Sequence, residues 1–509
     1  MMTAPLLNII TDVGMADLFA DRIHKKARWD PVNKMWRSYY DGAWRVDHRG
    51  HVRELAKETV KEAAGAALEA GDAELAKKIL AWHRHQGLSA MLELVKSVEG
   101  IPALPQEFDR DGWLLNTLTH TVDLRTGMAR AHDPADLLTK TCPAVYDPNA
   151  QCPRWQAFLD RIFASNQNVI SLLQRIFGMA LTGVIREHVF LVFWGTGANG
   201  KSTLLHVLLR LVGDYGAAVQ PEVFVDRDSD PQGFALADLP GVRVVVAVET
   251  KQNRKLNEPL VKFTTGRDRI RVARKYGQPF EFEPVFKPIL ATNHKPVIEG
   301  QDHAIWRRVK LVPFEVTIPD HEQDPELPDK LLEELPGILN WALAGCYEWQ
   351  SNGLAFPDEV TQATADYRAE QDVLADWIAA RCVVRPDVSD EVAGLYSDYV
   401  AWCQDNTDQP ISKRRFAQAL DDHGFTPVRL HRNTVRGRRG ICRIAQAPPP
   451  PKAEREDASR VEDANKAISE TLPSRTRIET SRKTASTSVL RPQTEIPWDD
   501  VDEALEQAR

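Results

Sequence analysis

The sequence has few of the features that mark membrane, secreted or zinc-binding proteins. It contains no run of 18 apolar residues, so no transmembrane helix is expected. The stretch Met1–Met15 has no basic segment before its apolar residues, so we expect no secretory signal and a cytoplasmic location. The 14 histidines include no H-E-x-x-H motif. The cysteines form no C-x-x-C pair, which argues against a zinc ribbon or a disulfide scaffold; they are Cys142, Cys152, Cys346, Cys382, Cys403 and Cys442.

The chain also has no excess of positive charge. It carries 64 Lys and Arg against 72 Asp and Glu, a net charge of −8. It is therefore not a basic nucleic-acid coat, and any DNA-binding surface must be local. Its 509 residues, 43% hydrophobic and 27% charged, fit several ordinary globular domains.

The first predicted domain, residues 1–150, has a mixed α+β pattern and reads as an accessory domain. Trp36–Val46 carries aromatic residues around Asp41-Gly42, which predicts a hairpin. Arg53–Gln86 predicts two helices that break near Gly71-Asp72, and Leu114–Arg125 predicts short strands. This pattern alone indicates no chemistry.

The second predicted domain, residues 151–316, begins with helical sequence and then alternates strands with helices. Val189–Trp194, Val242–Val248 and Pro288–Thr292 are short apolar runs typical of strands buried on both faces. Ser202–Val212 and Glu258–Thr264 have helical patterns. The alternation predicts an α/β fold with a parallel sheet. A helical connector at 317–370 is expected to follow.

A third folded domain is predicted at residues 371–446. Helices are expected at Asp372–Ala380, Glu391–Asn406 and Ser412–Gly424, and strands at Phe425–Leu430 and Gly440–Ala445 around a basic loop. Three helices and a two-stranded wing favour a winged-helix-like domain. After Gln446, a stretch rich in Pro, Ser, Thr, Glu and Arg predicts a disordered tail at 447–509. Its acidic end is either simply solvated or a short motif that docks a partner.

The most specific motif matches G-x-x-x-x-G-K-[ST], the P-loop. Glycines let backbone N–H groups approach phosphate oxygens, and the following helix adds a positive dipole. Lys201 is then a cation for the β- and γ-phosphates of ATP, and the Ser202 hydroxyl is a ligand for Mg²⁺. The predicted nucleotide-binding residues are Gly195, Thr196, Gly197, Ala198, Asn199, Gly200, Lys201, Ser202 and Thr203.

Further catalytic candidates follow the motif. Glu249 ends an apolar strand and is the best candidate for the carboxylate that acts with Mg²⁺, although Val248 rather than an acid precedes it. Asn293 follows the third strand, where an amide either positions the attacking water or simply forms the turn before His294-Lys295-Pro296. Arg307 or Arg308 is either an arginine finger presented to a neighbour's nucleotide or part of a structural ion pair.

Two basic segments are candidates for DNA contact. Thr264–Phe282 alternates basic and apolar residues and predicts a hairpin with a cationic tip that includes Arg274 and Lys275. Lys413–Arg443 holds nine Lys and Arg against two Asp, in the predicted winged-helix context. A solvated surface is the alternative for both. The candidates in the second segment are Lys413, Arg414, Arg432, Arg436, Arg438 and Arg439.

Five segments, in their order along the chain, resemble the superfamily 3 helicase core. They are GTGANGKST, VVVAVET, TTGRDRIRVARKYG, ILATNHKP and AIWRRVKLVPF. In particular, the sequence resembles phage and plasmid primase-helicases, which are related to the poxvirus primase-helicase. The likeness extends to about residues 20–445 through three further segments, LLNTLTHTVDLRTG, CPRWQAFLDRIF and LPGILNWALAGCYEW.

The resemblance implies an AAA+-like ring, expected to be a hexamer, that translocates on single-stranded DNA with ATP, typically 3′ to 5′. It implies that Lys201, Ser202, Glu249 and Asn293 form the nucleotide site and that Lys275, with Arg274, contacts DNA. Fuller members carry a primase module before the accessory domain. Here that region is already assigned, so we predict a helicase without its own primase activity.

The leading hypothesis is therefore a replicative helicase of a phage or mobile element that acts on single-stranded or forked DNA. The tail is a candidate site for recruiting a separate primase, a polymerase or a single-strand-binding protein, and no membrane partner is expected. The alternative is an origin-binding initiator ATPase with little unwinding activity. A small-molecule phosphotransferase is a third reading, which the two basic segments disfavour.

Overall fold

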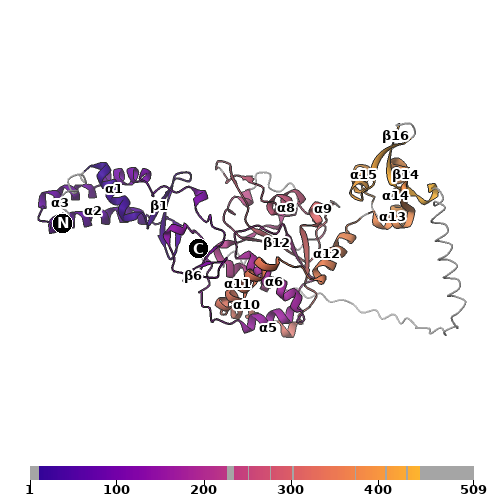
Figure 1. Cartoon of the computed structure of the whole chain (residues 1–509), viewed down its shortest axis with the longest axis horizontal. Helices are drawn as coiled ribbons and strands as arrows, with labels where there is room; N and C mark the ends of the chain where they lie inside the picture. Colours follow the sequence, from indigo (N-terminus) through magenta and orange to yellow (C-terminus); the bar gives the residue numbers. More distant parts are fainter. Residues whose placement is uncertain are drawn as a thin grey trace. The chain divides into compact units, whose positions relative to one another are not determined.

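The computed structural model describes residues 11–447 except 226–233, 250, 276, 301–302, 373, 407–409 and 431–433. The chain divides into two units, Met1–Gln446 and Ala447–Arg509, and the described residues belong to the first unit apart from Ala447 (Figure 1). The predicted disordered tail at 447–509 thus lies outside the described residues apart from Ala447. Within the described ranges, no helix combines the length and the apolar composition needed to cross a bilayer.

The N-terminal part combines helices with a small antiparallel sheet of order β1-β2-β3. The predicted hairpin is confirmed: Asp41 and Gly42 join β2 to β3 with φ of 49° and 74°, which suits a tight two-residue turn. The predicted helix break is also confirmed, because the Asp72 side chain accepts from Leu75 N and starts a new helix. The elements are α1 (Asp12–Ile23), β1 (Ala27–Asp30), β2 (Met35–Tyr40), β3 (Ala43–Val46), α2 (His51–Glu69), α3 (Ala73–Leu80) and α4 (His85–Leu94).

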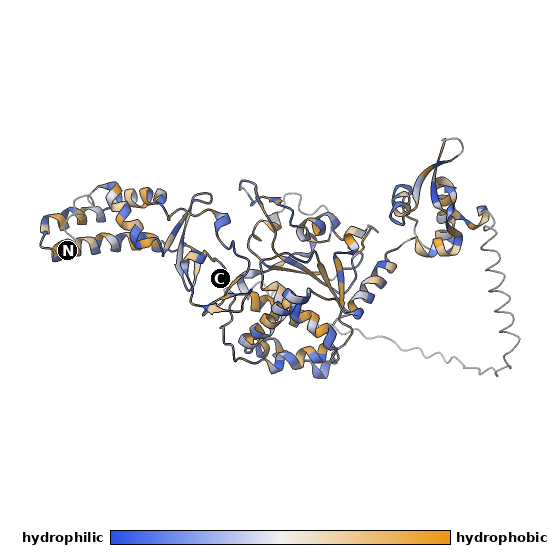
Figure 2. Cartoon of the chain, viewed as in Figure 1, coloured by the Kyte–Doolittle hydropathy of each residue, from blue (hydrophilic) through white to orange (hydrophobic). Residues whose placement is uncertain are grey.

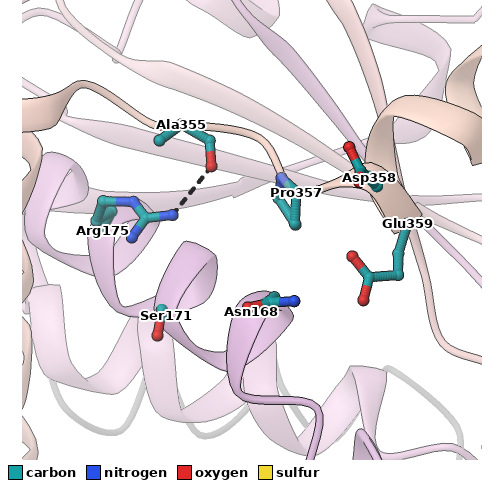
Figure 3. A pocket seen from close by; sticks show the side chains of 7 residues that line it. All are labelled: Asn168, Ser171, Arg175, Ala355, Pro357, Asp358 and Glu359. Carbon is teal, nitrogen blue, oxygen red and sulfur yellow. Dashed lines mark hydrogen bonds between the residues drawn. The ribbon is translucent and has the colours of Figure 1, made fainter.

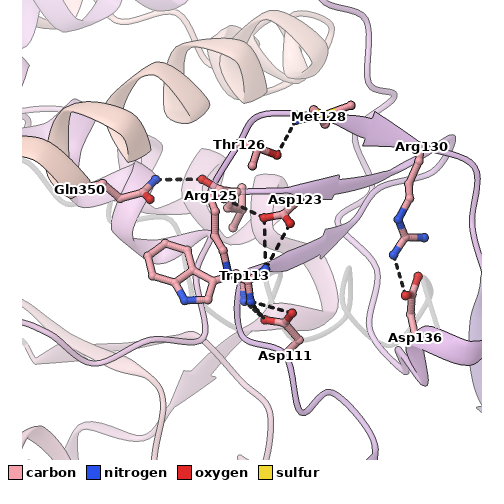
Figure 4. Close-up of polar contacts among 10 residues, drawn as sticks. Asp111, Trp113, Asp123, Arg125, Thr126, Met128, Arg130, Asp136 and Gln350 are labelled. Carbon is pink, nitrogen blue, oxygen red and sulfur yellow. Dashed lines mark hydrogen bonds and ion pairs between the residues drawn. The ribbon is translucent and has the colours of Figure 1, made fainter.

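A second antiparallel sheet fulfils the prediction of short strands after Leu114. Its turn residue Arg125 donates to both carboxylate oxygens of Asp111, at 2.6 and 2.7 Å, and to Asp123 (Figure 4). Gln350 of the distant helix α11 (Leu335–Asn352) donates to the Leu124 carbonyl at 2.8 Å, so this sheet is bonded to a helix far along the chain. The strands are β4 (Leu114–Asn116), β5 (Thr121–Asp123) and β6 (Ala129–Arg130).

The central sheet has five strands in the order β13-β7-β12-β9-β8, and every neighbouring pair is parallel. The predicted α/β fold with a parallel sheet is therefore confirmed, including all three predicted strands. The strands are β7 (Phe190–Trp194), β8 (Gly216–Val219), β9 (Val244–Glu249), β12 (Lys287–Thr292) and β13 (Val309–Pro313). The helices of this part are α5 (Pro153–Ile162), α6 (Gln167–Ala180), α7 (Lys201–Val212), α8 (Glu258–Thr265) and α9 (His303–Trp306).

Both faces of this sheet are buried, which explains why its strands read as continuous apolar runs. Val244 and Val246 belong to one hydrophobic cluster, whereas Val245 and Ala247 belong to the other. Successive side chains of a strand point to opposite faces, so an apolar residue is required at every position. Figure 2 shows the strands at the centre of the molecule coloured mostly as apolar.

Helices α6 and α11 cross at unusually close range beside the sheet. A Cβ added at Gly345 would lie 1.9 Å from the Gln174 carbonyl oxygen, and one added at Gly178 would lie 2.1 Å from Cys346 N. The two backbones therefore touch where both helices carry glycine, and this contact holds the helical layer that follows the core. That layer contains α10 (Leu327–Leu332), α11 (Leu335–Asn352) and α12 (Asp358–Glu370), as the helical pattern of 317–370 predicted.

The last described part contains the three predicted helices and a three-stranded antiparallel sheet of order β14-β16-β15. Two details differ from the prediction. Strand β14 was not expected, and the residues expected as a basic loop after Val435 lie in β16, which pairs with strands on both sides. The elements are α13 (Ala375–Arg381), β14 (Cys382–Glu391), α14 (Val392–Asp405), α15 (Lys413–Asp422), β15 (Thr426–Leu430) and β16 (Val435–Arg443).

Candidate nucleotide site

The glycine-rich loop at 195–200 connects the end of β7 to the start of α7. Gly197 and Gly200 have φ of 109° and 80°, in the region that favours glycine. Added Cβ atoms would also collide with neighbours, 2.4 Å from the Phe314 carbonyl oxygen at Gly195 and 2.5 Å from Ile162 Cγ2 at Gly200. The local backbone therefore requires the glycines of the motif.

Lys201 begins α7 and is buried, with 6% of its surface exposed. Its Nζ donates to Gly195 O at 2.8 Å, to Asn199 Oδ1 at 3.0 Å and to Asn293 Oδ1 at 3.3 Å. Burial lowers the pKa of Lys201 to about 8. The structure thus brings two predicted site residues, Lys201 and Asn293, into direct contact.

Asn199 has a defined place in this arrangement that the motif alone did not indicate. Its Nδ2 donates to the Phe314 carbonyl at 3.2 Å while its Oδ1 accepts from Lys201. The side chain is 3% exposed and ties the loop to the end of β13. Of the other loop residues, Thr196 and Ala198 are exposed, and Ser202 and Thr203 lie on the first turn of α7, with Ser202 exposed.

The ends of three parallel strands meet beside this loop. Thr292 of β12 is in register with Trp194 of β7 and with Glu249 of β9. Glu249 and Asn293 consequently lie at the same carboxyl edge of the sheet as the glycine-rich loop. Ligand sites of open parallel sheets form outside the carboxyl ends of the strands.

Glu249 is 2% exposed, although it ends a strand. Its Oε1 accepts from Lys251 N at 2.7 Å, and its Oε2 lies 3.5 Å from Arg254 Nε. Arg254 was missed in the sequence because a lone cation five positions after a strand end has no recognised spacing. No group of three or more His, Cys, Asp or Glu side chains converges on a metal site within the described residues.

The two finger candidates lie at the opposite edge of the sheet. Phe190 N, at the start of β7, donates to Arg308 O at 2.8 Å. The Arg308 guanidinium donates to Thr265 Oγ1 at 3.1 Å and to Ala304 O at 2.6 Å, so it is engaged within its own chain. Arg307 is exposed and makes no hydrogen bond or ion pair with any described residue.

The predicted basic hairpin is present between β9 and β12. β10 (Ile270–Val272) and β11 (Phe280–Phe282) pair antiparallel. Near its tip, Arg274 and Lys275 are exposed, and Arg274 Nε lies 3.1 Å from Asp238 Oδ1. The hairpin leaves the sheet at its amino edge, because α8 precedes it and β12 begins after it.

The candidates for DNA contact in the C-terminal part divide into two groups. Lys413 and Arg414 on α15, and Arg436 and Arg439 on β16, are exposed. Arg438 is 8% exposed and forms an ion pair with Asp421 at 3.0 Å, so its guanidinium is used inside the domain rather than at the surface. Arg432 lies outside the described residues.

A polar cavity of about 530 Å³ lies away from these residues (Figure 3). Its lining includes Ser171 and Arg175 of α6 and Glu359 of α12. The Arg175 guanidinium donates to the backbone carbonyls of Leu354 and Ala355, so it holds the connector to α6. The cavity contains none of the predicted site residues.

Two family models match the chain. Residues 16–164 match the "D5 N terminal like" family, and residues 193–308 match a family of unknown function. A solved structure of the apo NrS-1 C-terminal region aligns with 83% of this chain and 98% of that chain, at 11% identity and a TM-score of 0.47.

Relatives occur among large DNA viruses. A protein named "Putative helicase" from Acanthamoeba polyphaga mimivirus is 27% identical over 60% of this chain and 34% of that protein. Another of that name from Invertebrate iridescent virus 6 is 23% identical over 66% and 39%. A protein named "Putative primase" from African swine fever virus is 24% identical over 44% and 25%. The matched regions span 25–39% of the length of these relatives. The D5 N-terminal-like domain and these viral relatives confirm the resemblance of the chain to the primase-helicase family.

Proposed function

We propose that the chain is an ATP-dependent DNA helicase of phage or mobile-element replication, with an AAA+-like P-loop core of superfamily 3. The observation that carries the proposal is the convergence of the glycine-rich loop, Lys201, Glu249 and Asn293 at one carboxyl edge of the parallel sheet. Relatives named as helicases support the same reading.

ATP would lie with its phosphates along the loop at 195–200, facing the backbone N–H groups at the start of α7. Lys201 would leave its carbonyl and amide partners to bind the β- and γ-phosphates. Asn293, already within 3.3 Å of the Lys201 ammonium, would contact the γ-phosphate and orient the attacking water.

Mg²⁺ fits the donor set of this edge. The buried Oε2 of Glu249 accepts no hydrogen bond from a described residue, and the Ser202 hydroxyl is exposed on the first turn of α7. Mg²⁺ usually takes one or two protein oxygens and completes its shell with phosphates and water, and it would neutralise phosphate charge here.

The family resemblance implies a ring of subunits, expected to be a hexamer, and the separation of the two edges of the sheet supports an arginine finger that acts between subunits. Five residues of β7 at about 3.3 Å each keep the amino edge more than ~13 Å from the loop, beyond the reach of an arginine in the same chain. Arg307 would instead approach the nucleotide of a neighbouring subunit. Its exposure favours it over Arg308, whose guanidinium is bonded to Thr265 and Ala304.

Single-stranded or forked DNA would be held by the hairpin, through Arg274 and Lys275, and by the exposed cations of a winged-helix-like C-terminal domain. Translocation from 3′ to 5′ is the polarity that the family resemblance implies. A partner such as a separate primase, a polymerase or a single-strand-binding protein would dock on the tail at 447–509.

The test is ATP hydrolysis with and without single-stranded DNA, together with unwinding of a forked duplex. Wild-type protein should hydrolyse ATP faster with DNA and unwind the fork, and Lys201→Ala should lose both activities while keeping its melting temperature. Equal hydrolysis with and without DNA, and no unwinding, would refute the proposal.

A second candidate is an origin-binding initiator ATPase with little unwinding activity. The exposed cations Lys413, Arg414, Arg436 and Arg439 of the C-terminal part favour it, because exposed cations on a winged-helix-like domain suit contact with duplex DNA. Sequence-dependent duplex binding that is lost on removing residues 390–445, without unwinding, would support this candidate over the helicase.

We assign no primer synthesis to this chain. The measurement is ribonucleotide or deoxyribonucleotide incorporation on a single-stranded template. Product made by the purified chain alone would overturn that assignment.

A further inference from the structure

The small sheet of the N-terminal part carries two arginines directly opposite each other. Arg28 of β1 is the register partner of Arg37 of β2, so both side chains leave the sheet on the same face. Like charges in this position repel each other and destabilise the strand pair unless an opposite charge lies beside them. The N-terminal part, whose sequence pattern indicated no chemistry, thus holds a pair of facing cations.

Neither arginine forms an ion pair with a described residue. Arg28 donates to the backbone carbonyls of His24 and Ala27. Arg37 makes no side-chain hydrogen bond to the described part of the chain, and its Nε is buried without a partner. A guanidinium that is taken from water and left unbonded is costly, so the arrangement favours an anion supplied from outside the chain.

The two acids that act on Arg37 are engaged elsewhere. Asp30 is completely buried and accepts three hydrogen bonds from the turn at 32–33. Asp109 accepts from both the backbone N and the hydroxyl of Thr139. Burial lowers the pKa of Arg37, although both carboxylates raise it. The charge of Arg37 is therefore only partly compensated within the chain.

An aromatic ring holds each guanidinium in place. Arg28 Cζ lies 5.0 Å from the centre of the Trp44 ring, and Arg37 Cζ lies 4.9 Å from the centre of the Phe108 ring. The rings are 0% and 7% exposed, whereas both arginines keep part of their surface open to solvent. Contacts of this kind orient a guanidinium without neutralising its charge. The two cations are therefore preorganised for an anion.

A third cation and the predicted DNA hairpin lie close to this pair. The Lys140 ammonium bonds to no described residue, and a Cβ added at Gly241 would lie 2.8 Å from Lys140 Cε. Burial lowers the pKa of Lys140, Asp109 raises it, and the charge of Arg37 lowers it. The charge of Arg274, near the hairpin tip, also lowers the pKa of Arg37. The positive charge of the sheet therefore continues toward the hairpin.

We propose that Arg28, Arg37 and Lys140 form a phosphate-binding site for single-stranded DNA, which extends the DNA contact of the hairpin onto the sheet of the N-terminal part. The inference rests on the proposed function and adds a second contact site to it. A phosphodiester between the facing guanidiniums replaces their repulsion with charge-assisted hydrogen bonds. The rings beneath them are covered, so the site contacts the strand through phosphate and carries no base preference.

The test measures the affinity of the full chain for a labelled oligothymidylate by fluorescence anisotropy over a range of salt concentrations. For single strands, the logarithm of the affinity falls with the logarithm of the salt concentration with a slope of about −0.7 per phosphate contact. Arg37→Gln and Lys140→Gln should each reduce the magnitude of the slope by about 0.7. The double variant Arg28→Gln/Arg37→Gln should reduce it by about 1.4 and bind about 25-fold more weakly at about 0.1 M salt.

Three further measurements act as controls. Lys61→Gln should leave the slope unchanged, because Lys61 is exposed on α2 of the same part and takes no role in the site. Arg37→Lys keeps the charge and should keep a slope near that of the wild type. Affinity for ATP alone should not change in any variant, because a site for a free nucleotide would lose it. Lys140→Gln decides the test where an arginine variant does not fold, since no described residue depends on the Lys140 ammonium for a bond.

The outcomes separate this inference from the function on which it rests. A wild-type chain that binds no single strand and shows no DNA-stimulated hydrolysis contradicts the proposed function. A wild type that binds the strand contradicts the inference alone if Lys140→Gln keeps the wild-type slope, or if Lys61→Gln reduces the slope equally. Equal losses in Arg37→Lys and Arg37→Gln would show that Arg37 acts through packing, and a loss of ATP affinity would indicate a nucleotide site; either result would also overturn the inference.

Discussion

Replacing Arg307 and replacing Arg308, the two adjacent arginines at the amino edge of the sheet, should affect activity and stability differently. Arg307→Ala removes an exposed guanidinium that bonds to no described residue. Arg308→Ala removes donors to Thr265 Oγ1 and Ala304 O. If Arg307 is the finger, its loss should cost activity and not stability, and the loss of Arg308 should cost stability.

The magnitudes differ enough to be distinguished. Removing an arginine finger lowers kcat by about 10³–10⁵-fold, which is about 4–7 kcal/mol of transition-state stabilisation. Arg307→Ala should shift the free energy of unfolding by no more than about 0.5 kcal/mol, as for other exposed positions. Arg308→Ala loses hydrogen bonds from a half-buried cation, an expected destabilisation of about 1–3 kcal/mol.

The decisive assay mixes inactive subunits. Lys201→Ala protein retains Arg307, and Arg307→Ala protein retains the glycine-rich loop. A subunit interface, or seam, has an intact site when the loop comes from an Arg307→Ala subunit and the arginine from a Lys201→Ala subunit. Mixed in equal amounts, about a quarter of the seams in a head-to-tail ring should be competent. Recovery of DNA-stimulated ATP hydrolysis on mixing is the expected result. Wild-type kcat in Arg307→Ala, or assembled mixtures that stay inactive, would refute the reasoning.

Three further expectations follow from other sites. Burial lowers the pKa of Lys201 to about 8, and only its charged form binds phosphate. The affinity for ATP, measured by calorimetry, should therefore fall as the pH rises through 8, by about tenfold per pH unit at most. An affinity that does not change between pH 7 and pH 9 would contradict this. Gly345→Ala should destabilise the chain by about 1–3 kcal/mol through overpacking, whereas Gly65→Ala, with open space around it in helix α2, should be neutral or stabilising in the same denaturant titration. Arg439→Gln should weaken DNA binding and reduce its salt dependence, whereas Arg438→Gln should mainly lower the melting temperature of the C-terminal part; the reverse pattern would show that the buried guanidinium reaches DNA.

The features that the sequence predicted correctly are those that depend on residues close together in the chain, where few residue types fit the local structure. Val244–Val248 is apolar at every position because both faces of its strand are buried, and this pattern is hard to mistake. The Asp41-Gly42 turn and the Asp72 cap are decided by neighbouring backbone within a few residues. The glycine-rich loop has the same character, since its φ angles require its composition.

The features that were missed depend on contacts between distant segments. Strand β14 has a polar, proline-containing sequence, and its pairing with β16 shifts register between Val384 and Ser389 of β14, so no alternating pattern survives. The described part of the expected basic loop is strand from Val435 on, because β16 bonds to a neighbour on either side. Arg254 and Arg438 looked like ordinary surface cations, and only their carboxylate neighbours show their use.

The bonding around the carboxyl edge has a consequence for how a nucleotide would act there. Lys201 is bonded to Gly195 O and Asn293, and Glu249 is bonded to Lys251 N and faces Arg254. The two buried charged groups that would meet a phosphate or a metal ion, Lys201 and Glu249, already have internal partners, because a buried charge without one would be expensive. Binding at this edge is therefore an exchange of partners, and its net free energy is smaller than the new contacts suggest. The exchange would change the partners of Asn293 and of the 251–254 segment, and Val297 joins that segment to the chain after Asn293. A nucleotide that contacted only the glycine-rich loop would leave the partners of Glu249 unchanged, whereas one whose metal ion bound Glu249 would replace them.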